Sequence, residues 1–108
     1  MAAYPEVTVD ELAARLADGA VLFDVREPDE YVAGHVAGAV LIPLGSVPAR
    51  AGEFPTSGDV YVICKSGGRS GRACEFLRDQ GVAAINIAGG TMGWMSSGRE
   101  VVSGDQPS

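Results

Sequence analysis

Short apolar runs alternate along this chain with stretches whose apolar residues recur at helical spacing. Most of the runs hold four or five residues, are rich in β-branched side chains and end at glycine, proline or charged residues, which is typical of buried strands. The pattern predicts strands over residues 7–9, 21–25, 39–42, 60–63 and 84–87. It predicts helical segments over residues 11–17, 28–32, 45–51 and 70–80, with a last one around Trp94. Strands that alternate with helices indicate an α/β fold with a parallel sheet covered on both faces.

Capping residues mark the expected helix ends. Asp10 and Ser70 are expected to be the N-caps of the first helix and the longest helix, and Gly81 follows the end of the longest one. A chain of 108 residues is enough for one hydrophobic core. We expect a single domain over residues 1–101, with the polar residues 102–108 as a frayed C-terminal tail.

The segment with the clearest candidate chemistry is residues 60–70. Cys64 follows a predicted buried strand, and ligands of such folds bind at the carboxyl ends of strands. Gly67 and Gly68 allow successive N–H groups to converge on an anion, and the helix after them adds the positive end of its dipole. With Lys65 and Arg69 alongside, we expect a lowered pKa for the Cys64 thiol and affinity for an anionic substrate. The alternative is a structural cysteine, which would gain nothing from these neighbours.

The distribution of charge supports a site for a small anion. A net charge of −6 argues against nucleic acid and anionic membrane surfaces as partners. Half of the eight basic residues nevertheless lie just after the Cys64 strand. The two cysteines do not form a disulfide framework, and neither a secretory signal nor a transmembrane run is visible. We therefore expect a cytoplasmic, reducing setting.

Several separated motifs occur in the order found in a known family. They are residues 24–28, 30–31, 34–39 and 42–43, the loop 64–70, and Gly89 and Gly90 followed by Trp94. In these motifs the chain resembles the rhodanese family, the single-domain sulfurtransferases, over roughly residues 7–94. The resemblance implies a rhodanese-like fold, a single-domain α/β/α sandwich with a five-stranded parallel sheet.

The resemblance also implies a reaction. The thiolate of Cys64 would attack the outer sulfur of thiosulfate or another persulfide donor, and the resulting Cys64 persulfide would pass its sulfur to cyanide or a thiol. The N–H groups of the loop would stabilise the persulfide anion, while Lys65 and Arg69 would hold the sulfonate of the donor. No metal or organic cofactor is needed. The implied catalytic residue is Cys64, and the implied substrate-binding residues are Lys65, Ser66, Gly67, Gly68, Arg69 and Ser70.

Two other functions stay open at this point. Phosphatases and arsenate reductases also place an arginine after a cysteine, but in a wider loop than the four residues, 65–68, that separate Cys64 from Arg69. A persulfide carrier or interaction module, fed by a protein partner, would have the same loop as an enzyme that turns over thiosulfate.

Four further residues are interpreted structurally, and a fifth, Trp94, stays open between two roles. Asp24 and Arg26 are expected to form a hydrogen-bonded brace between loops, and His35 to make structural hydrogen bonds rather than act as a base. Cys74 is expected in the core rather than as a resolving thiol. Trp94 fits either the core or a wall of the active loop.

Overall fold

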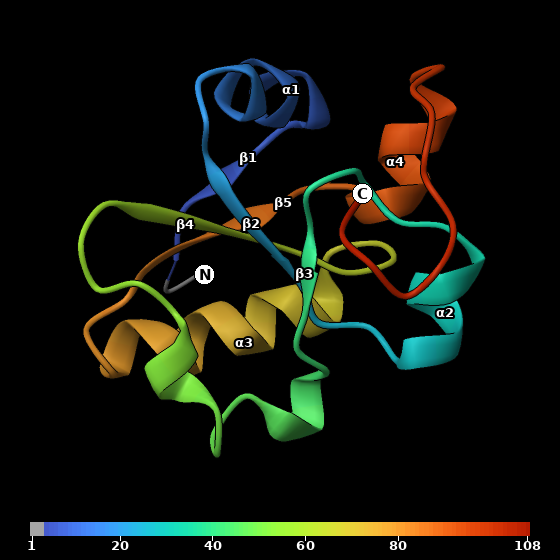
Figure 1. The fold of residues 1–108 in the computed structure, drawn as a ribbon. Coiled ribbons are helices and arrows are strands. Elements are labelled where there is room, and N and C mark those ends of the chain that lie inside the picture. Colours follow the sequence, from blue (N-terminus) through green and yellow to red (C-terminus); the bar gives the residue numbers. More distant parts are fainter. Residues whose placement is uncertain (1–3) are drawn as a thin grey trace.

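A five-stranded sheet crosses the centre of the protein in the computed structural model, which describes residues 4–108 (Figure 1). All its strand pairs are parallel, and the strand order is β1-β5-β4-β2-β3. The strands are β1 (Glu6–Val7), β2 (Val21–Asp24), β3 (Val40–Leu41), β4 (Asp59–Ile63) and β5 (Ala83–Ile87). The predicted five-stranded parallel sheet is confirmed.

Helices cover both faces of this sheet. They are α1 (Val9–Ala17), α2 (Pro28–Ala33), α3 (Gly68–Asp79) and α4 (Gly90–Ser96). Figure 1 shows α3 beneath the sheet, whereas α1 and α4 lie above it. None of the helices in residues 4–108 combines the length and hydropathy that a bilayer span requires.

The alternation of side chains along the two central strands builds two separate cores. On β4, Val60 and Val62 pack with Leu77 of α3, and Cys64, directly after the strand, belongs to the same cluster. The intervening Tyr61 and Ile63 point to the opposite face, where α1 and α4 pack. Because side chains alternate between faces with a period of two, Cys64 must lie on the α3 side of the sheet.

The first residues of two helices differ from the sequence prediction. Thr8, not Asp10, caps α1, because its hydroxyl accepts the Glu11 N–H, and Asp10 lies in the first turn. Helix α3 starts at Gly68 with Gly67 as its N-cap, so Ser70 is a first-turn residue rather than the cap. The helix expected over residues 45–51 is replaced by two 3₁₀ turns, Leu44–Ser46 and Ala51–Glu53.

The C-terminal segment also differs from the prediction. Residues 102–108 were expected to fray, yet Val102 pairs with His35 through two backbone hydrogen bonds of 2.8 Å. Gly104 donates to the Val32 carbonyl, and the Pro107 carbonyl accepts the Gly38 N–H. These contacts use backbone groups, so the polar composition of the segment gave no sign of them.

A buried ion pair connects the end of β2 to the chain after α2. The Arg26 guanidinium donates to both Asp24 carboxylate oxygens at 2.8–3.1 Å and to the Gly34 carbonyl at 2.8 Å. The two side chains are 7% and 0% exposed. This geometry is the brace between loops that the sequence indicated.

Replacing one partner of this pair is expected to be strongly destabilising. Arg26→Met would leave the Asp24 carboxylate buried without its countercharge, at a cost of about 3–5 kcal/mol. Urea unfolding measures the loss. As a control, Arg50→Met breaks the exposed pair between Arg50 and Glu53 and should change the free energy of unfolding far less. Similar small losses for both variants would contradict a bracing role for Arg26.

Candidate active site

The loop that connects β4 to α3 wraps around the sulfur of Cys64. Cys64 follows the last residue of β4, and the chain then turns at Gly67 into the first turn of α3. Gly67 has a φ of 115°, a backbone conformation that residues with a Cβ rarely adopt. This glycine allows the chain to reverse so tightly that N–H groups of the loop face the sulfur.

Two donors contact the Cys64 sulfur directly. The Gly67 N–H lies 3.1 Å from Sγ, and the Ser70 hydroxyl oxygen lies 3.2 Å from it. Cys64 as a whole is only 1% exposed. Burial tends to raise the pKa of the thiol, but hydrogen bonds from the Ser70 hydroxyl, and then from the Ser70, Gly67 and Ser66 N–H groups, hold it below its ordinary value. The site thus favours a thiolate through hydrogen bonds.

Helix α4 holds the start of the loop from the other side. The Thr91 N–H and hydroxyl both donate to the Cys64 carbonyl, at 2.9 and 3.0 Å, and the Met92 N–H donates to the Lys65 carbonyl at 3.0 Å. This approach is possible because residue 90 is glycine. A Cβ there would lie 2.5–2.6 Å from the Lys65 and Cys64 carbonyl oxygens. Gly90 belongs to one of the motifs seen in the sequence, but this close approach to the loop was not predicted.

The loop arginine, Arg69, has a partner that the sequence analysis did not foresee. Its guanidinium makes two hydrogen bonds, of 2.6 and 2.9 Å, to the Glu30 carboxylate of α2. The hydrogen bond from Arg69 holds the pKa of Glu30 at about 2, below its usual range. A depressed pKa means that the pair stabilises the fold above the ordinary pKa of a glutamate and loses this effect as the pH falls toward about 2. Arg69 therefore ties the loop to α2.

Lys65 is the other basic residue of the loop, and it makes no ion pair within residues 4–108. It lines a pocket of about 290 Å³, together with Glu30 of α2 and Met92 and Met95 of α4. The two methionines are about half exposed. The pocket therefore combines one free positive charge with flexible apolar walls, immediately beside the loop.

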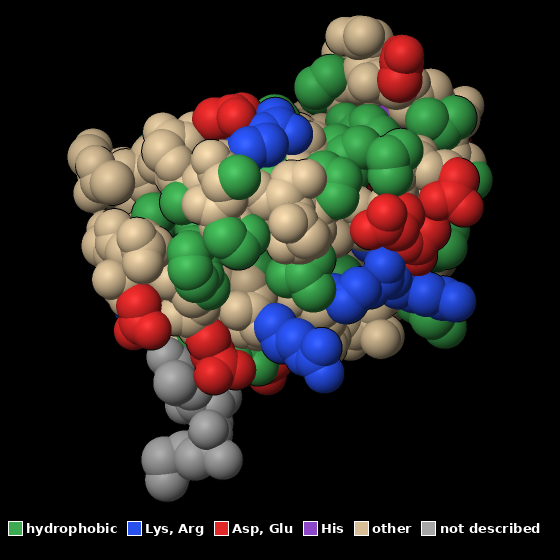
Figure 2. All heavy atoms as spheres, turned by 90° about the horizontal axis from the view of Figure 1, so that it is seen from below, with side chains coloured by type: hydrophobic (Ala, Val, Ile, Leu, Met, Phe, Trp, Pro, Cys, Tyr) green, Lys and Arg blue, Asp and Glu red, His purple; other side chains and the backbone are tan. Residues whose placement is uncertain are grey.

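Charges of both signs surround this region of the molecule. On the α3 side, Figure 2 shows acidic side chains directly beside basic ones, and hydrophobic side chains are exposed elsewhere on the same face. The locally basic loop expected from the sequence is thus partly neutralised in three dimensions, as the contact between Arg69 and Glu30 illustrates.

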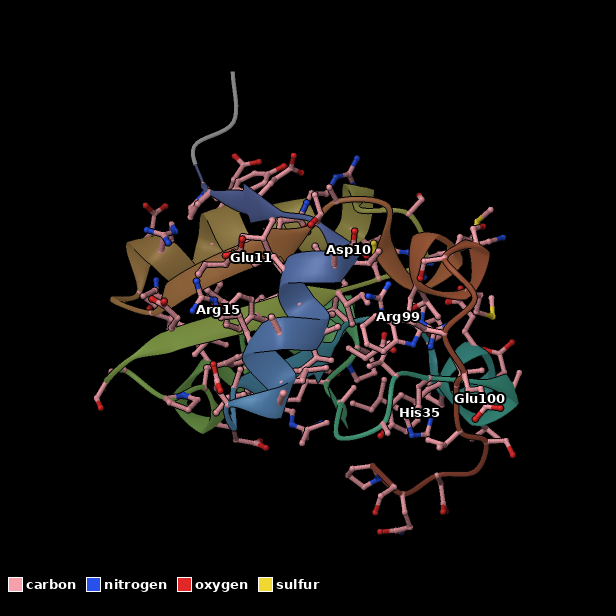
Figure 3. All side chains as sticks on the ribbon, turned by 90° about the horizontal axis from the view of Figure 1, so that it is seen from above. Asp10, Glu11, Arg15, His35, Arg99 and Glu100 are labelled. Carbon is pink, nitrogen blue, oxygen red and sulfur yellow. The ribbon has the colours of Figure 1, made fainter. Side chains whose placement is uncertain are left out.

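The second cysteine and the single histidine take no part in the loop. Cys74, on α3, is fully buried in the core, and this burial raises the pKa of its thiol to about 12. His35 stacks on Tyr31, and its ring nitrogens contact the Tyr31 and Pro107 carbonyls at 2.8 and 3.2 Å. Figure 3 shows it next to the C-terminal segment. Both positions match the structural interpretations.

Trp94 belongs to the core on the opposite face of the sheet from Cys64. It packs in the cluster that contains Leu12 of α1, and its indole N–H donates to the Glu100 carbonyl at 2.9 Å. Arg99 lies 5.3 Å from the centroid of its ring and forms an ion pair with Asp10 at the start of α1 (Figure 3). Trp94 is therefore a core residue that secures α4 rather than a wall of the loop.

One buried polar residue near the sulfur was not recognised from the sequence. Asn86 on β5 is fully buried and its amide oxygen accepts a hydrogen bond from the Ser70 hydroxyl. The signal was present, because Asn86 is the one polar residue in an otherwise apolar predicted strand. A buried amide requires hydrogen-bond partners, so this residue indicated a polar contact beside the strand.

The fold and the loop together define a class of protein. A parallel sheet with a hydrogen-bonded, low-pKa cysteine at the carboxyl end of a central strand is the arrangement of a domain that works through a cysteine sulfur. A family profile described as "Rhodanese-like domain" matches residues 8–97. The chain belongs to this family of sulfurtransferase domains.

Known relatives cover almost the whole domain. The chain is 36% identical to a sulfurtransferase of Allochromatium vinosum, over 90% of this chain and 94% of that protein. It is 31% identical to the thiosulfate sulfurtransferase GlpE of Pseudomonas entomophila, over 90% of each. Among solved structures, a rhodanese-related protein of Thermoplasma volcanium superposes with a TM-score of 0.86 and 29% identity, over 92% of this chain and 98% of that chain. Two relatives from Bacillus subtilis are longer, and the chain matches 60% and 50% of their lengths.

Substitution of Gly90 is expected to displace the active loop. In Gly90→Ala, the new Cβ would collide with the Cys64 and Lys65 carbonyl oxygens, and the φ of +58° would itself cost about 1–2 kcal/mol. We expect a lower melting temperature and slower alkylation of Cys64 by iodoacetamide. The matched control is Gly45→Ala, where a Cβ meets nothing within 4 Å. Unchanged Cys64 reactivity in Gly90→Ala would show that α4 does not position the loop.

Proposed function

We propose that this protein is a thiosulfate sulfurtransferase that carries sulfur on Cys64 as a persulfide. The observation that supports this most directly is the pair of hydrogen bonds from Gly67 and Ser70 to a buried sulfur whose pKa is lowered. Such a thiolate is a nucleophile at neutral pH. The similarity to a thiosulfate sulfurtransferase over nine-tenths of both chains adds to this support.

The proposed reaction has two steps. In the first, the Cys64 thiolate attacks the outer sulfur of thiosulfate, the bond between the two thiosulfate sulfurs breaks, and sulfite leaves with the bonding electron pair. Cys64 then carries a persulfide whose outer sulfur is negatively charged. In the second, cyanide or a thiolate attacks that outer sulfur, and Cys64 departs as a thiolate. The loop N–H groups stabilise negative charge on sulfur in each state.

We assign the residues of the loop as follows. The cradle around the transferred sulfur consists of the backbone N–H groups of Ser66, Gly67, Gly68 and Ser70. The Ser70 hydroxyl contacts Sγ of Cys64 itself. Lys65 attracts the sulfonate, because this residue lines the pocket and makes no ion pair within residues 4–108. Arg69 was expected to share that role, but its bidentate contact with Glu30 favours a role in holding the loop. Because this contact occupies the arginine, it also disfavours binding of a phosphoryl group as in a phosphatase or arsenate reductase.

The site does not distinguish an enzyme that uses free thiosulfate from a carrier that receives its persulfide from a protein. Both need the same nucleophile and the same cradle. In either case the acceptor is a thiol or cyanide, and a reducing compartment such as the cytoplasm would keep Cys64 and Cys74 in the free form that the structure has.

The intact mass of the protein after incubation with thiosulfate tests the proposal. We expect one added sulfur atom, which is lost when cyanide is added. Cys64→Ala should gain none, because the nucleophile is gone, whereas Cys74→Ala should gain sulfur as the unmodified protein does.

The other outcomes are informative. Added sulfur in Cys64→Ala would assign the chemistry to another residue and overturn the proposal. No added sulfur from thiosulfate, but uptake from a cysteine persulfide on a desulfurase, would identify a carrier. Release of phosphate from an aryl phosphate by the unmodified protein would identify a phosphatase.

Two sulfur donors, one charged and one uncharged, distinguish the roles of the two basic residues of the loop. Lys65→Met should raise the KM for thiosulfate about five- to tenfold, equivalent to the roughly 1 kcal/mol of one exposed charge pair, and leave transfer from an uncharged organic trisulfide unchanged. Arg69→Ala should slow both reactions equally, because it loosens the loop. Steady-state kinetics with the two donors measures this. A selective loss of thiosulfate use in Arg69→Ala would instead give Arg69 the sulfonate.

A further inference from the structure

The Ser70 hydroxyl contacts two acceptors but has one proton. Its oxygen lies 3.2 Å from the Cys64 sulfur and within hydrogen-bond distance of the Asn86 amide oxygen. A serine hydroxyl donates one hydrogen bond at a time. When Cys64 is a thiolate, the sulfur and the Asn86 oxygen therefore compete for the same proton.

The Asn86 amide cannot avoid this competition by turning over. Its nitrogen donates to the Glu6 carboxylate at 2.7 Å and to the Gly67 carbonyl at 3.1 Å, and both groups accept hydrogen bonds only. Exchange of the amide oxygen and nitrogen would place an oxygen against these two acceptors. The network thus fixes the amide oxygen toward Ser70.

The sheet places Asn86 for this contact. Asn86 pairs with Val62 on β4 and with Glu6 on β1, and alternation along β5 turns it to the same face of the sheet as Cys64. Asn86 and Ser70 are each 0% exposed. Water therefore does not offer the Asn86 oxygen a replacement when the Ser70 proton turns away.

We propose that Asn86 is a positioning residue of the sulfur site: it holds the Ser70 proton while Cys64 is a thiol and yields it to sulfur when sulfur becomes negatively charged. In the thiol state, the Cys64 S–H donates to the Ser70 oxygen, and Ser70 donates to Asn86. On ionisation the thiol proton leaves to solvent, and the Ser70 O–H turns from Asn86 to the sulfur.

The consequence for sulfur transfer rests on the function proposed above. When the persulfide forms, the negative charge moves from Sγ to the outer sulfur, and Sγ becomes a neutral, weak acceptor. The Ser70 proton then returns to Asn86. Asn86 thereby opposes the thiolate slightly and favours the persulfide. The equilibrium of sulfur transfer is shifted toward the state in which Cys64 carries the sulfur.

Other charged groups lie near the site, and they are part of the background in any titration. They are Glu6 on β1, Asp24 and Arg26 at the end of β2, Glu30 on α2, Lys65 in the loop and Arg69 on α3. Variants that leave all of these unchanged isolate the Ser70 proton.

A spectroscopic test is available because Asn86 is the only asparagine in the chain. Protein labelled with ¹³C at the asparagine side-chain carbonyl gives one signal, which NMR can follow through a pH titration. We expect the signal to shift as Cys64 ionises, with the midpoint found from the pH dependence of Cys64 alkylation. In Ser70→Ala and in Cys64→Ala that shift should disappear.

The opposite results overturn the proposal. A signal that does not move while Cys64 ionises, or one that moves equally in Ser70→Ala, would show that the Ser70 proton is not exchanged between the two acceptors. The titration needs no sulfur donor, so it fails or succeeds independently of the proposed activity.

The alkylation rate of Cys64 in a variant gives a second test. The proposal predicts a faster rate, whereas a merely structural role of Asn86 predicts a slower one. Asn86→Ala frees the Ser70 hydroxyl for the sulfur. At pH values below the pKa of Cys64, the thiolate fraction should therefore rise about tenfold, and the alkylation rate of Cys64 should rise by the same factor. If Asn86 only supported the loop, its loss would weaken the donors and lower that rate. In a Ser70→Ala background the substitution should not raise the rate, because only the contact of Asn86 with the Gly67 carbonyl and with Glu6 is then lost.

Discussion

The rest of the site depends on the balance between burial and hydrogen bonding at one sulfur atom. Cys64 is 1% exposed, and burial by itself favours a neutral thiol. The Ser70 hydroxyl and the N–H groups of residues 66, 67 and 70 reverse that preference. Each of these donors has a fixed direction only if the loop keeps its shape. The remaining contacts around the loop serve to keep it.

Three contacts from different elements fix the loop. The first turn of α4 binds the Cys64 and Lys65 carbonyls, Glu30 of α2 binds Arg69, and Asn86 of β5 binds the Gly67 carbonyl. Each contact joins the loop to a different part of the fold. The carbonyl groups face outward to these supports, so the N–H groups are left to face the sulfur. A rigid cradle therefore results from elements that are far apart in the sequence.

The sequence predicted the parts of this arrangement that are local. The β4 run, the glycines and the basic residues after Cys64 predicted a strand, a tight turn and an anion site. The family resemblance added the five-stranded parallel sheet, and the strand order came only from the structure. What the sequence did not reveal were contacts between distant segments. The ion pair between Arg69 and Glu30 spans 39 residues, and the contact between Asn86 and Glu6 spans 80. The antiparallel bridge between His35 and Val102 is of the same kind. Such pairs form only when elements that are far apart in the sequence become neighbours in the fold. The local patterns of a single sequence do not show which elements these are.

A comparison with Cys74 shows the effect of the hydrogen-bond donors on the pKa of Cys64. Both cysteines are buried in the same core cluster on the α3 side of the sheet, and both are free. The pKa of Cys74 rises to about 12, chiefly through burial, whereas the pKa of Cys64 is lowered. The difference cannot come from exposure, because both side chains are nearly inaccessible. It comes from the turn at Gly67, which brings N–H groups to one sulfur, while the regular helix around Cys74 commits its N–H groups to its own backbone. The irregular backbone at residues 64–67 therefore lowers the pKa of one buried thiol, while the pKa of the other is raised.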